Sequence, residues 1–487
     1  MYKDKEIING KQKKYIPENL DLDLILAEHP PVFKYKKDHF IHILNLLTEI
    51  AAYDKRLIEN QRFVPINKQK LQSHIHNYKD YLTYLQEMGI IESDKQYIVG
   101  EKSISFRFTE KYQTTNKEVL VEKSSYNHSY QKSKKVDSRH LYPKLAKFFD
   151  DGLNIDVQAA KNCVRMKLEQ DIADNDEKAF GRYNAAMLNI CRLSDHKFYF
   201  HVDETSGRLH TNLTNLPKIV RNFITYEGKP LVSVDISNSQ PFLSTLLMNQ
   251  KFFEKIEVKS ENLFNIFNIF PKLPSTHPTF YKFLPTIMLV FGEDSLRKQG
   301  NQDIAKYRQK ASEGKLYEYM EEEIFKATGK RFMSRREIKN MIFSVLYSGN
   351  QFIGQPDAES KRLFRSLFPT VYEVFKLIKR HDKTFLPILL QSIEAKLILN
   401  NIAKRFCMEK RNVPIFTIHD SIVCQVGYEE YVKLLMQEEA LKCVGIKPHL
   451  NPEYWKPENA IEGILRSKNE LLLPELPKQP MIFSVAS

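Results

Sequence analysis

Two short runs of apolar, mostly β-branched residues lead into aspartates, and this pairing constrains the fold more than any other feature. The first run spans 231–234 and is followed by Asp235, and the second spans 415–418 and is followed, after one histidine, by Asp420. Runs of this length and composition are typical of buried strands. We therefore expect a sheet that delivers two carboxylates to one rim, where they would share a pair of divalent cations.

A basic helix is expected between the two aspartates, in the stretch SRREIKNMIFSVLYSGN at 334–350. Arg335, Lys339, Phe343 and Tyr347 recur at every fourth residue, so at 3.6 residues per turn they share one broad face. The two cations would hold phosphates, with Lys339 also donating a proton to a pyrophosphate leaving group, and the rings would pack against a base and a sugar. The alternative is an ordinary amphipathic helix with one solvated end and one buried end, because this spacing is common.

The order of these motifs resembles the palm and fingers of the family A DNA polymerases, the DNA polymerase I type. The block TSGRLHTNLTNLPKIVR at 205–221 is similar to the family's Gly-Arg-Leu and Asn-Leu-x-Asn-x-Pro segment, which touches primer and template. The stretch LLQSIEAKLILNNIAKRF at 389–406 resembles the helix that reads the primer-template minor groove through a glutamine. With the aspartates and the basic helix, the likeness covers roughly residues 200–430.

The resemblance implies a right-hand polymerase fold of the α+β class, and it assigns roles to individual residues. Asp235 and Asp420 would be the catalytic ligands of two Mg²⁺ or Mn²⁺ ions. The incoming nucleoside triphosphate would contact Arg335, Lys339, Phe343, Tyr347 and Gln240, with Lys339 also catalytic as the proton donor. The DNA primer-template would contact Arg208, Asn212, Asn215, Gln391 and His419.

Three positions depart from the family pattern. Gln240 stands where the polymerases place a glutamate that helps to exclude a ribose 2′-hydroxyl. Ser421 follows His-Asp where the DNA enzymes usually have glutamate, and His-Asp-Ser is similar to the phage-type single-subunit RNA polymerases. Ser348 replaces the glycine expected after the helix tyrosine, with Gly349 one place later. The departures leave the sugar preference open and keep the two aspartates that the chemistry needs.

The charge of the chain favours a polyanionic partner. Its 487 residues give room for two or three domains, and 73 lysines and arginines against 60 aspartates and glutamates leave a net charge of +13. Such a surplus releases counterions when it neutralises phosphates. There is no run of about 18 apolar residues and no apolar secretion signal, so we expect a cytoplasmic protein without membrane partners. The five cysteines are scattered without a close pair and are expected to be reduced.

The N-terminal region has a pattern of its own. Two stretches at 40–54 and 76–89 have helical apolar spacing, and the second ends at Gly89 as a left-handed cap requires. The alternating stretch 90–108 predicts a hairpin with its turn at Gly100 and Glu101. Helices followed by a basic hairpin resemble a winged-helix module, which would bind duplex DNA through its major groove. The alternative is a module used only for protein contacts or packing.

These patterns divide the chain into five regions. Residues 1–115 would form the winged-helix-like domain, and 116–138, rich in lysine and serine, a basic linker. Residues 139–200 are expected to be thumb-like helices, 201–450 the palm and fingers, and 451–487 a proline-rich tail without chemistry. The region upstream of the palm has neither the length nor the acidic residues of a proofreading exonuclease, so we expect no proofreading.

The favoured hypothesis is a template-directed DNA polymerase with a two-metal mechanism and without proofreading, suited to replicating or priming a mobile element. A second hypothesis, motivated by Gln240 and Ser421, is an RNA polymerase or primase on the same palm. A third is a DNA-binding regulator or replication initiator that uses the polymerase fold only as a scaffold. A dead site would have no physical reason to keep two repelling carboxylates opposite a cationic helix, which argues against the third hypothesis.

Overall fold

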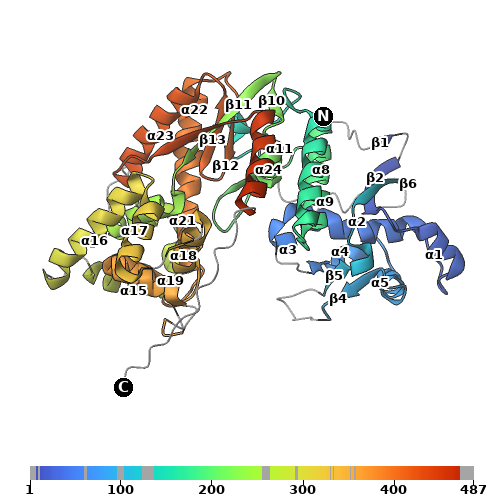
Figure 1. Ribbon diagram of the computed structural model, residues 1–487, viewed down its shortest axis with the longest axis horizontal. Coiled ribbons are helices and arrows are strands. Elements are labelled where there is room, and N and C mark those ends of the chain that lie inside the picture. The colour runs from blue at the N-terminus through green and yellow to red at the C-terminus, as the bar shows by residue number, and fades with distance from the viewer. Residues whose placement is uncertain are drawn as a thin grey trace.

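Helices and strands are mixed in this chain and form two lobes with separate cores (Figure 1). The computed structural model describes residues 7–8, 11–59, 63–95, 104–122, 137–254, 264–290, 294–329, 331–332, 334–350, 353–355 and 358–471. The smaller lobe contains the N-terminal residues, drawn in blue, and the larger lobe contains the chain after residue 137.

Three helices and a three-stranded sheet form most of the smaller lobe. In chain order they are α2 (Lys37–Tyr53), β3 (Val64–Pro65), α4 (Lys68–Gln72), α5 (Tyr78–Glu87), β4 (Ile91–Ser93) and β5 (Ser105–Phe108). The sheet has the antiparallel order β3-β5-β4. Residues 40–48 of α2 are all buried, so this helix is the centre of the lobe.

The helices and the hairpin predicted for this region are confirmed. Gly89 follows α5 with a φ of 63°, the left-handed conformation that glycine adopts without strain at the end of a helix. Strands β4 and β5 pair with Ile91 opposite Phe108. The turn expected at Gly100 and Glu101 lies outside the described residues.

A second small sheet corrects the extent of the predicted linker. Strands β1 (Ile7–Ile8), β2 (Lys11–Pro17) and β6 (Asn116–Glu122) pair in antiparallel fashion. Residues 116–122 are therefore a strand of the smaller lobe, because Val121 packs into its core at 1% exposure while charged neighbours face outward. Composition alone hides one buried position among lysines and glutamates. The rest of the predicted linker, up to residue 136, lies outside the described residues.

A six-stranded sheet is the centre of the larger lobe. Its strands are β7 (Leu153–Ile155), β10 (Ile224–Tyr226), β11 (Lys229–Ile236), β12 (Ile415–Ile418), β13 (Ser421–Gln425) and β14 (Leu450–Tyr454). The strand order is β12-β13-β11-β10-β7, and β14 pairs with β11 along the edge opposite β13. Strand β11 is paired on both edges, and its residues from Leu231 to Val234 are buried, including the polar Ser233.

Two strands of this sheet come from outside the predicted palm. Strand β7 lies in the region expected to be helical throughout, and β14 lies in the predicted tail. Each follows or contains residues that favour turns, Gly152 before β7 and Pro452 within β14, so neither has a clear strand pattern. Trp455, which follows β14, is 4% exposed within the main core. The structural unit around the sheet therefore extends beyond both predicted boundaries.

Helices cover the sheet and connect the two lobes (Figure 1). Between the lobes lie α8 (Val157–Ala173) and α9 (Ala179–Ser194), the region predicted as thumb-like. The longer helices in the lower part of the larger lobe are α15 (Pro278–Leu289), α16 (Asp294–Ser312), α17 (Leu316–Thr328), α18 (Arg335–Tyr347), α19 (Glu359–Leu367) and α20 (Pro369–Ile378). A continuous helical segment follows as α21 (Phe385–Ala395), the π-helical η6 (Lys396–Ala403) and α22 (Lys404–Glu409).

The remaining elements are short or lie at the ends of the lobes. They are α1 (Leu22–Glu28), α3 (Lys55–Glu59), η1 (Glu110–Tyr112), α7 (Pro143–Ala146), β8 (Phe200–Val202), β9 (Leu209–Thr211), α10 (Asn212–Asn215), α11 (Lys218–Arg221), α12 (Ser239–Ser244), η3 (Thr245–Met248), η4 (Gln250–Phe252), α13 (Ile266–Ile269), α14 (Leu273–Thr276), α23 (Glu429–Val444) and α24 (Pro457–Leu471). No described helix is both long and apolar enough to cross a membrane. The five cysteines are free, as predicted.

The lobes are joined by ion pairs that run from α2 and α3 to α9. Arg192 Nη2 lies 2.9 Å from Glu49 Oε1, and its guanidinium carbon lies 4.1 Å from the centre of the Tyr53 ring. Arg182 makes a bidentate contact with Glu59, with two nitrogen–oxygen distances of 2.8 Å. The side chains of α9 therefore fix the smaller lobe to the larger one.

Candidate active site

The sheet brings the two predicted aspartates to neighbouring strands. Strands β11 and β13 pair with Asp235 opposite Ser421, so Asp420 immediately precedes the residue that faces Asp235. A turn of two residues, His419 and Asp420, joins β12 to β13, and His419 takes a left-handed φ of 54°. The two carboxylates thus come from the same end of adjacent strands, as the sequence predicts.

The surroundings of the aspartates suit a divalent cation. Ser233 Oγ donates a hydrogen bond of 2.9 Å to Asp235 Oδ1. Burial raises the pKa of Asp420, a hydrogen bond from Ser239 opposes this shift, and the Asp235 carboxylate adds to it. The two carboxylates repel each other, and their oxygens are hard ligands. A bound divalent cation would neutralise their charge. Among the described residues no three His, Cys, Asp or Glu side chains form a metal cluster.

A basic residue that the sequence analysis did not single out faces these carboxylates. Arg221 ends α11, and the carboxylates that act on its guanidinium are Asp235, Glu453 and Asp420. Burial lowers the pKa of Arg221, and the three carboxylates oppose that shift. Arg221 is also the last residue of the 205–221 block, so its place in that motif was the available signal. Its charge offsets part of the negative charge at the rim.

Helix α18 presents the predicted ladder on a face separate from its buried face. The buried face consists of Ile338, Met341, Ile342, Val345 and Leu346. On the ladder, Arg335 and Lys339 are exposed, and the rings of Phe343 and Tyr347 are partly buried, 5.3 Å apart and inclined at 62°. The Lys339 ammonium lies 5.3 Å from the centre of the Phe343 ring. The ladder thus has a solvated cationic end and an aromatic end where Tyr347 packs against the core, an arrangement that both the binding interpretation and the amphipathic alternative predict.

A basic cavity opens along the N-terminal half of α18. Its volume is about 470 Å³, and it is lined by Arg335, Arg336, Lys339, Asn340 and Phe343. The first turns of a helix also carry the positive end of the helix dipole and unpaired N–H groups. Arg335 is paired with Glu318 on α17, at 3.0 Å from Nε to Oε1. Three cations in one cavity at a helix N-terminus suit a polyphosphate.

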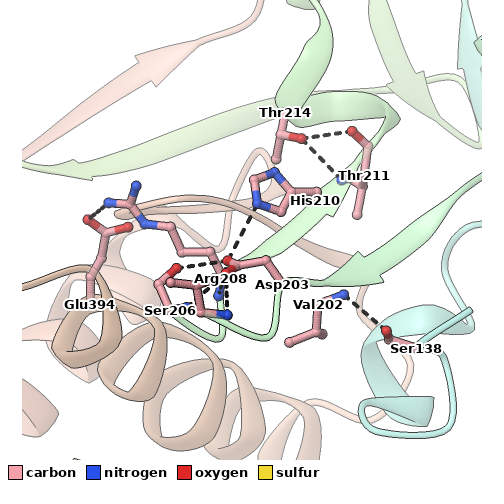
Figure 2. Close-up of polar contacts among 10 residues, drawn as sticks. Ser138, Val202, Asp203, Ser206, Arg208, His210, Thr211, Thr214 and Glu394 are labelled. Carbon is pink, nitrogen blue, oxygen red and sulfur yellow. Dashed lines mark hydrogen bonds and ion pairs between the residues drawn. The ribbon is translucent and has the colours of Figure 1, made fainter. Parts of the chain in front are cut away.

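Arg208 is positioned by a tight turn between β8 and β9 (Figure 2). The Asp203 carboxylate accepts hydrogen bonds from the N–H groups of Ser206 and Arg208, at 2.8 and 3.1 Å, and from the Ser206 hydroxyl at 2.7 Å. Gly207 takes a φ of 74°, which glycine adopts without strain. Burial alone would raise the pKa of Asp203, yet His210 and these donors hold it well below its usual range. The turn is therefore rigid and aims Arg208 away from the hairpin.

Arg208 reaches a buried glutamate that the sequence analysis missed (Figure 2). Glu394 on α21 is 1% exposed, and its Oε2 lies 2.7 Å from Arg208 Nη2 and 2.6 Å from Gln240 Nε2. Burial raises the pKa of Glu394 to about 7, with Arg208 opposing the shift and Asp420 adding to it. Glu394 stands three residues after Gln391, which is about one helical turn. This spacing from a predicted site residue could have identified Glu394 from the sequence.

Tyr347 connects the helix ladder to the carboxylates. Burial raises the pKa of Tyr347, and the charges that act on its hydroxyl include those of Arg208, Glu394 and Asp420. Burial raises the pKa of Tyr317 on α17 to about 12, with Arg335 opposing this shift and Asp420 adding to it, and the Arg335 guanidinium carbon lies 4.8 Å from the centre of the Tyr317 ring. The ring end of α18 thus lies beside the rim where Asp420 is placed.

The other residues predicted to contact primer and template lie around this rim. Asn212 is buried, and its amide accepts from the Tyr199 N–H at 2.9 Å and donates to the Lys197 carbonyl at 3.0 Å. The Asn212 amide therefore holds residues 197–199 against the start of α10. Asn215 and Gln391 are partly buried. The His419 ring lies edge-on to His210, with centroids 6.1 Å apart. Contact of these residues with nucleic acid stays a prediction.

The comparisons with known proteins give a distant likeness to solved structures. No protein-family model and no curated protein matches the chain. Among solved structures, the chain is similar to the POL domain of Pol1 from M. smegmatis, which was solved in complex with DNA primer-template and dNTP. The identity is 12%, the match covers 66% of this chain and 70% of that chain, and the TM-score is 0.38.

Proposed function

We propose that the chain is a template-directed nucleic-acid polymerase, in the first place a DNA polymerase. The observation that carries the proposal is the pairing of β11 with β13, which sets Asp235 and Asp420 at one rim. Tyr347 links this rim to the cationic helix α18. In this interpretation the six-stranded sheet is the palm, α15 to α20 are the fingers, and α8 and α9 are thumb-like.

The proposed chemistry assigns binding and proton transfer to the chain's own residues. Asp235 and Asp420 would hold two divalent ions, which when bound activate the attacking hydroxyl and stabilise the leaving oxygen. Arg335 and Lys339, joined by Arg336, neutralise the triphosphate in the basic cavity. Lys339 donates a proton to the pyrophosphate as it leaves.

The nucleic acid would be held by both lobes. Primer and template would contact Arg208, Asn215, Gln391 and His419, while the buried Asn212 holds this segment through its hydrogen bonds to residues 197 and 199. The smaller lobe would bind duplex DNA, because the order of α2, β3, α4, α5, β4 and β5, with the short α3 between α2 and β3, resembles that of a winged helix. No proofreading is expected, and priming or replication of a mobile element is the role that suits this architecture.

A second candidate is an RNA polymerase or primase on the same site. It is favoured by Ser421, which is buried directly opposite Asp235, and by Gln240 in place of a glutamate. A bulkier acidic side chain at either place would add a charge beside the two aspartates. Without that acidic side chain, neither position excludes a ribonucleotide by its charge.

The test is extension of a labelled primer on a template with Mg²⁺ and either deoxy- or ribonucleotides. Asp420→Asn should lower the rate by about a thousandfold or more, because several kcal/mol of charge stabilisation depend on the metal site. Asp382→Asn is the matched control, since the Asp382 carboxylate caps a turn through Thr384 and has no part in the proposed chemistry. Extension by wild type and control alone would support the polymerase. Failure of wild type on primed and unprimed templates with both nucleotide sets would favour a DNA-binding regulator.

A further inference from the structure

Glu394 has no part in the mechanism above, although it lies within the proposed site. Its Oε2 accepts hydrogen bonds from Arg208 and Gln240 at 2.7 and 2.6 Å. Its charge acts on Tyr347, and that of Asp420 acts on Glu394. The carboxylate is therefore beside both the rim and the ring end of α18.

The contact with Glu394 fixes the orientation of the Gln240 amide. A carboxylate oxygen accepts hydrogen bonds, so the NH₂ group of Gln240 faces Glu394 and its carbonyl oxygen faces away. The reverse orientation would set two acceptor oxygens against each other. Gln240 is 7% exposed, which leaves little room for the side chain to take another rotamer. The amide oxygen of Gln240 is thus held in one direction.

Two acceptor oxygens in this cluster have no donor. Oε1 of Gln240 and Oε1 of Glu394 are buried without a hydrogen-bond partner among the described residues. Buried polar atoms are nearly always paired, because an unpaired one weakens the state that contains it. A substrate that brings a hydroxyl donor to this place would pair an oxygen, whereas a substrate without it would leave the oxygen unpaired. Sites of this kind reject the analogue that lacks the hydroxyl.

The sugar is the part of a nucleotide that would reach these oxygens. The basic cavity at the N-terminal half of α18 would take the phosphates, and the aspartates would lie at the reacting phosphate. Helix α18, which carries Tyr347 at the other end of the ladder, packs against α21, which carries Glu394, and the charges of Glu394 and Asp420 act on the Tyr347 hydroxyl. The group bonded to the reacting phosphate is the sugar, and its hydroxyls are the donors that a nucleotide offers there.

We propose that Glu394 determines the choice of sugar, by holding Gln240 as a hydrogen-bond acceptor for a sugar hydroxyl of the incoming nucleoside triphosphate. This inference rests on the proposed polymerase function, whose substrate it specifies. Glu394 acts as a positioning residue, and Gln240 makes the contact. The hydroxyl is on C2′ or C3′, and both present the same O–H donor.

The experiment measures kcat/KM for incorporation of one nucleotide from ribo-, deoxy- and 2′,3′-dideoxynucleoside triphosphates. The ribo-to-deoxy ratio reports on a 2′-hydroxyl, and the deoxy-to-dideoxy ratio reports on a 3′-hydroxyl. Wild type should prefer the hydroxyl-bearing member of one pair by about tenfold or more. Glu394→Gln keeps the side-chain volume but lets either end of the new amide face Gln240, so it should reduce that ratio several-fold. Gln240→Leu should reduce the same ratio and leave the other pair's ratio in place.

Glu439→Gln is the matched control, because it neutralises another buried glutamate whose Oε1 pairs with Arg405 and Lys442 at 2.8 and 2.9 Å. Its ratios should equal those of wild type. Unchanged ratios in Glu394→Gln and Gln240→Leu would overturn the proposal, as would a wild type without preference in either pair. If thermal unfolding shows that Glu394→Gln does not fold, the ratio of Gln240→Leu decides. Loss of incorporation from all three substrates in wild type would instead reject the polymerase function itself.

Discussion

At the scale of single residues, each predicted metal ligand has a residue with a left-handed backbone conformation close to it in the chain. Asn238 has a φ of 53° shortly after Asp235, and His419 has a φ of 54° directly before Asp420. Non-glycine residues rarely take this conformation, and such strain is most often found at functional sites. The Asn238 amide is buried with both its nitrogen and its oxygen unpaired within the described part of the chain. Gly207, in the turn that aims Arg208, is a third left-handed residue, and it carries no such strain.

Gly207→Ala tests the importance of that turn. An added Cβ would meet only the Ala395 Cβ at 3.9 Å, so the cost comes from the φ of 74° and should be about 1–2 kcal/mol of unfolding free energy. Denaturant unfolding measures it. Gly354→Ala is the control, since Gly354 has no positive φ and no neighbour within 4 Å of the added atom. Equal stability of the two variants would show that the turn tolerates a side chain.

At the scale of elements, the C-terminal end of α18 is held by two buried lysines. The Lys379 ammonium donates to the carbonyls of Val345 and Ser348, the second at 2.9 Å, and Lys361 donates to the Gly349 carbonyl. Burial, with Lys361 adding to it, lowers the pKa of Lys379 to about 8. Cations at a helix C-terminus balance the helix dipole. The end of α18 that carries Tyr347 is therefore fixed, while its cationic end faces the open cavity.

The contact of α2 with α9 makes a prediction about pH. Burial alone would raise the pKa of Glu49, yet Arg192, Lys14 and Asn45 hold it below its ordinary value of about 4.5. Because the pKa is lower in the folded state, the pair stabilises the protein above pH about 4.5, and this contribution is lost as the pH falls through the folded pKa. Glu49→Gln should cost about 1–2 kcal/mol at neutral pH and progressively less in acid.

Urea unfolding at a series of pH values measures that difference. Glu373→Gln is the control, since Glu373 forms an exposed pair with Lys376 at 3.0 Å and should contribute less than about 0.5 kcal/mol. If the loss of unfolding free energy in Glu49→Gln stayed constant down to the lowest pH, the negative charge of Glu49 would not be the source of the stabilisation.

At the scale of the whole molecule, the candidate site depends on distant parts of the chain. One carboxylate comes from β11 and the other from the turn before β13, while β14 covers the second edge of β11. The smaller lobe has its own core, drawn from residues 16–121. The stability of the larger lobe therefore depends on β14, whereas the stability of the smaller lobe does not.

Ending the chain after residue 447 should separate the stabilities of the two lobes. The truncation removes β14 and the buried Trp455, so the larger lobe should lose its cooperative unfolding transition and its activity. The smaller lobe should remain protected from proteases. A chain ending at residue 471 keeps both features and is the control. Retained cooperative unfolding of the larger lobe in the shorter chain would contradict the prediction.

The sequence predicts the parts of this molecule that depend on local patterns. The apolar strands that lead to Asp235 and Asp420, the four-residue ladder of α18 and the cap at Gly89 each follow from the spacing of a few residues, and the structure has them. What the sequence hides depends on tertiary contacts. Strand β14 contains a proline and forms only against β11. Glu394 is buried because Arg208 and Gln240, far away in the chain, meet it.

The pairing of β11 on both edges also affects how the chain folds while it is being synthesised. Strand β11 leaves the ribosome long before β13 and β14. Residues 231–234 therefore lack their two partner strands while almost half the chain is translated. An exposed apolar strand invites pairing with other chains. The smaller lobe is complete by residue 122 and can fold first. We therefore expect slow translation or a holding chaperone to affect the yield of the larger lobe much more than that of the smaller.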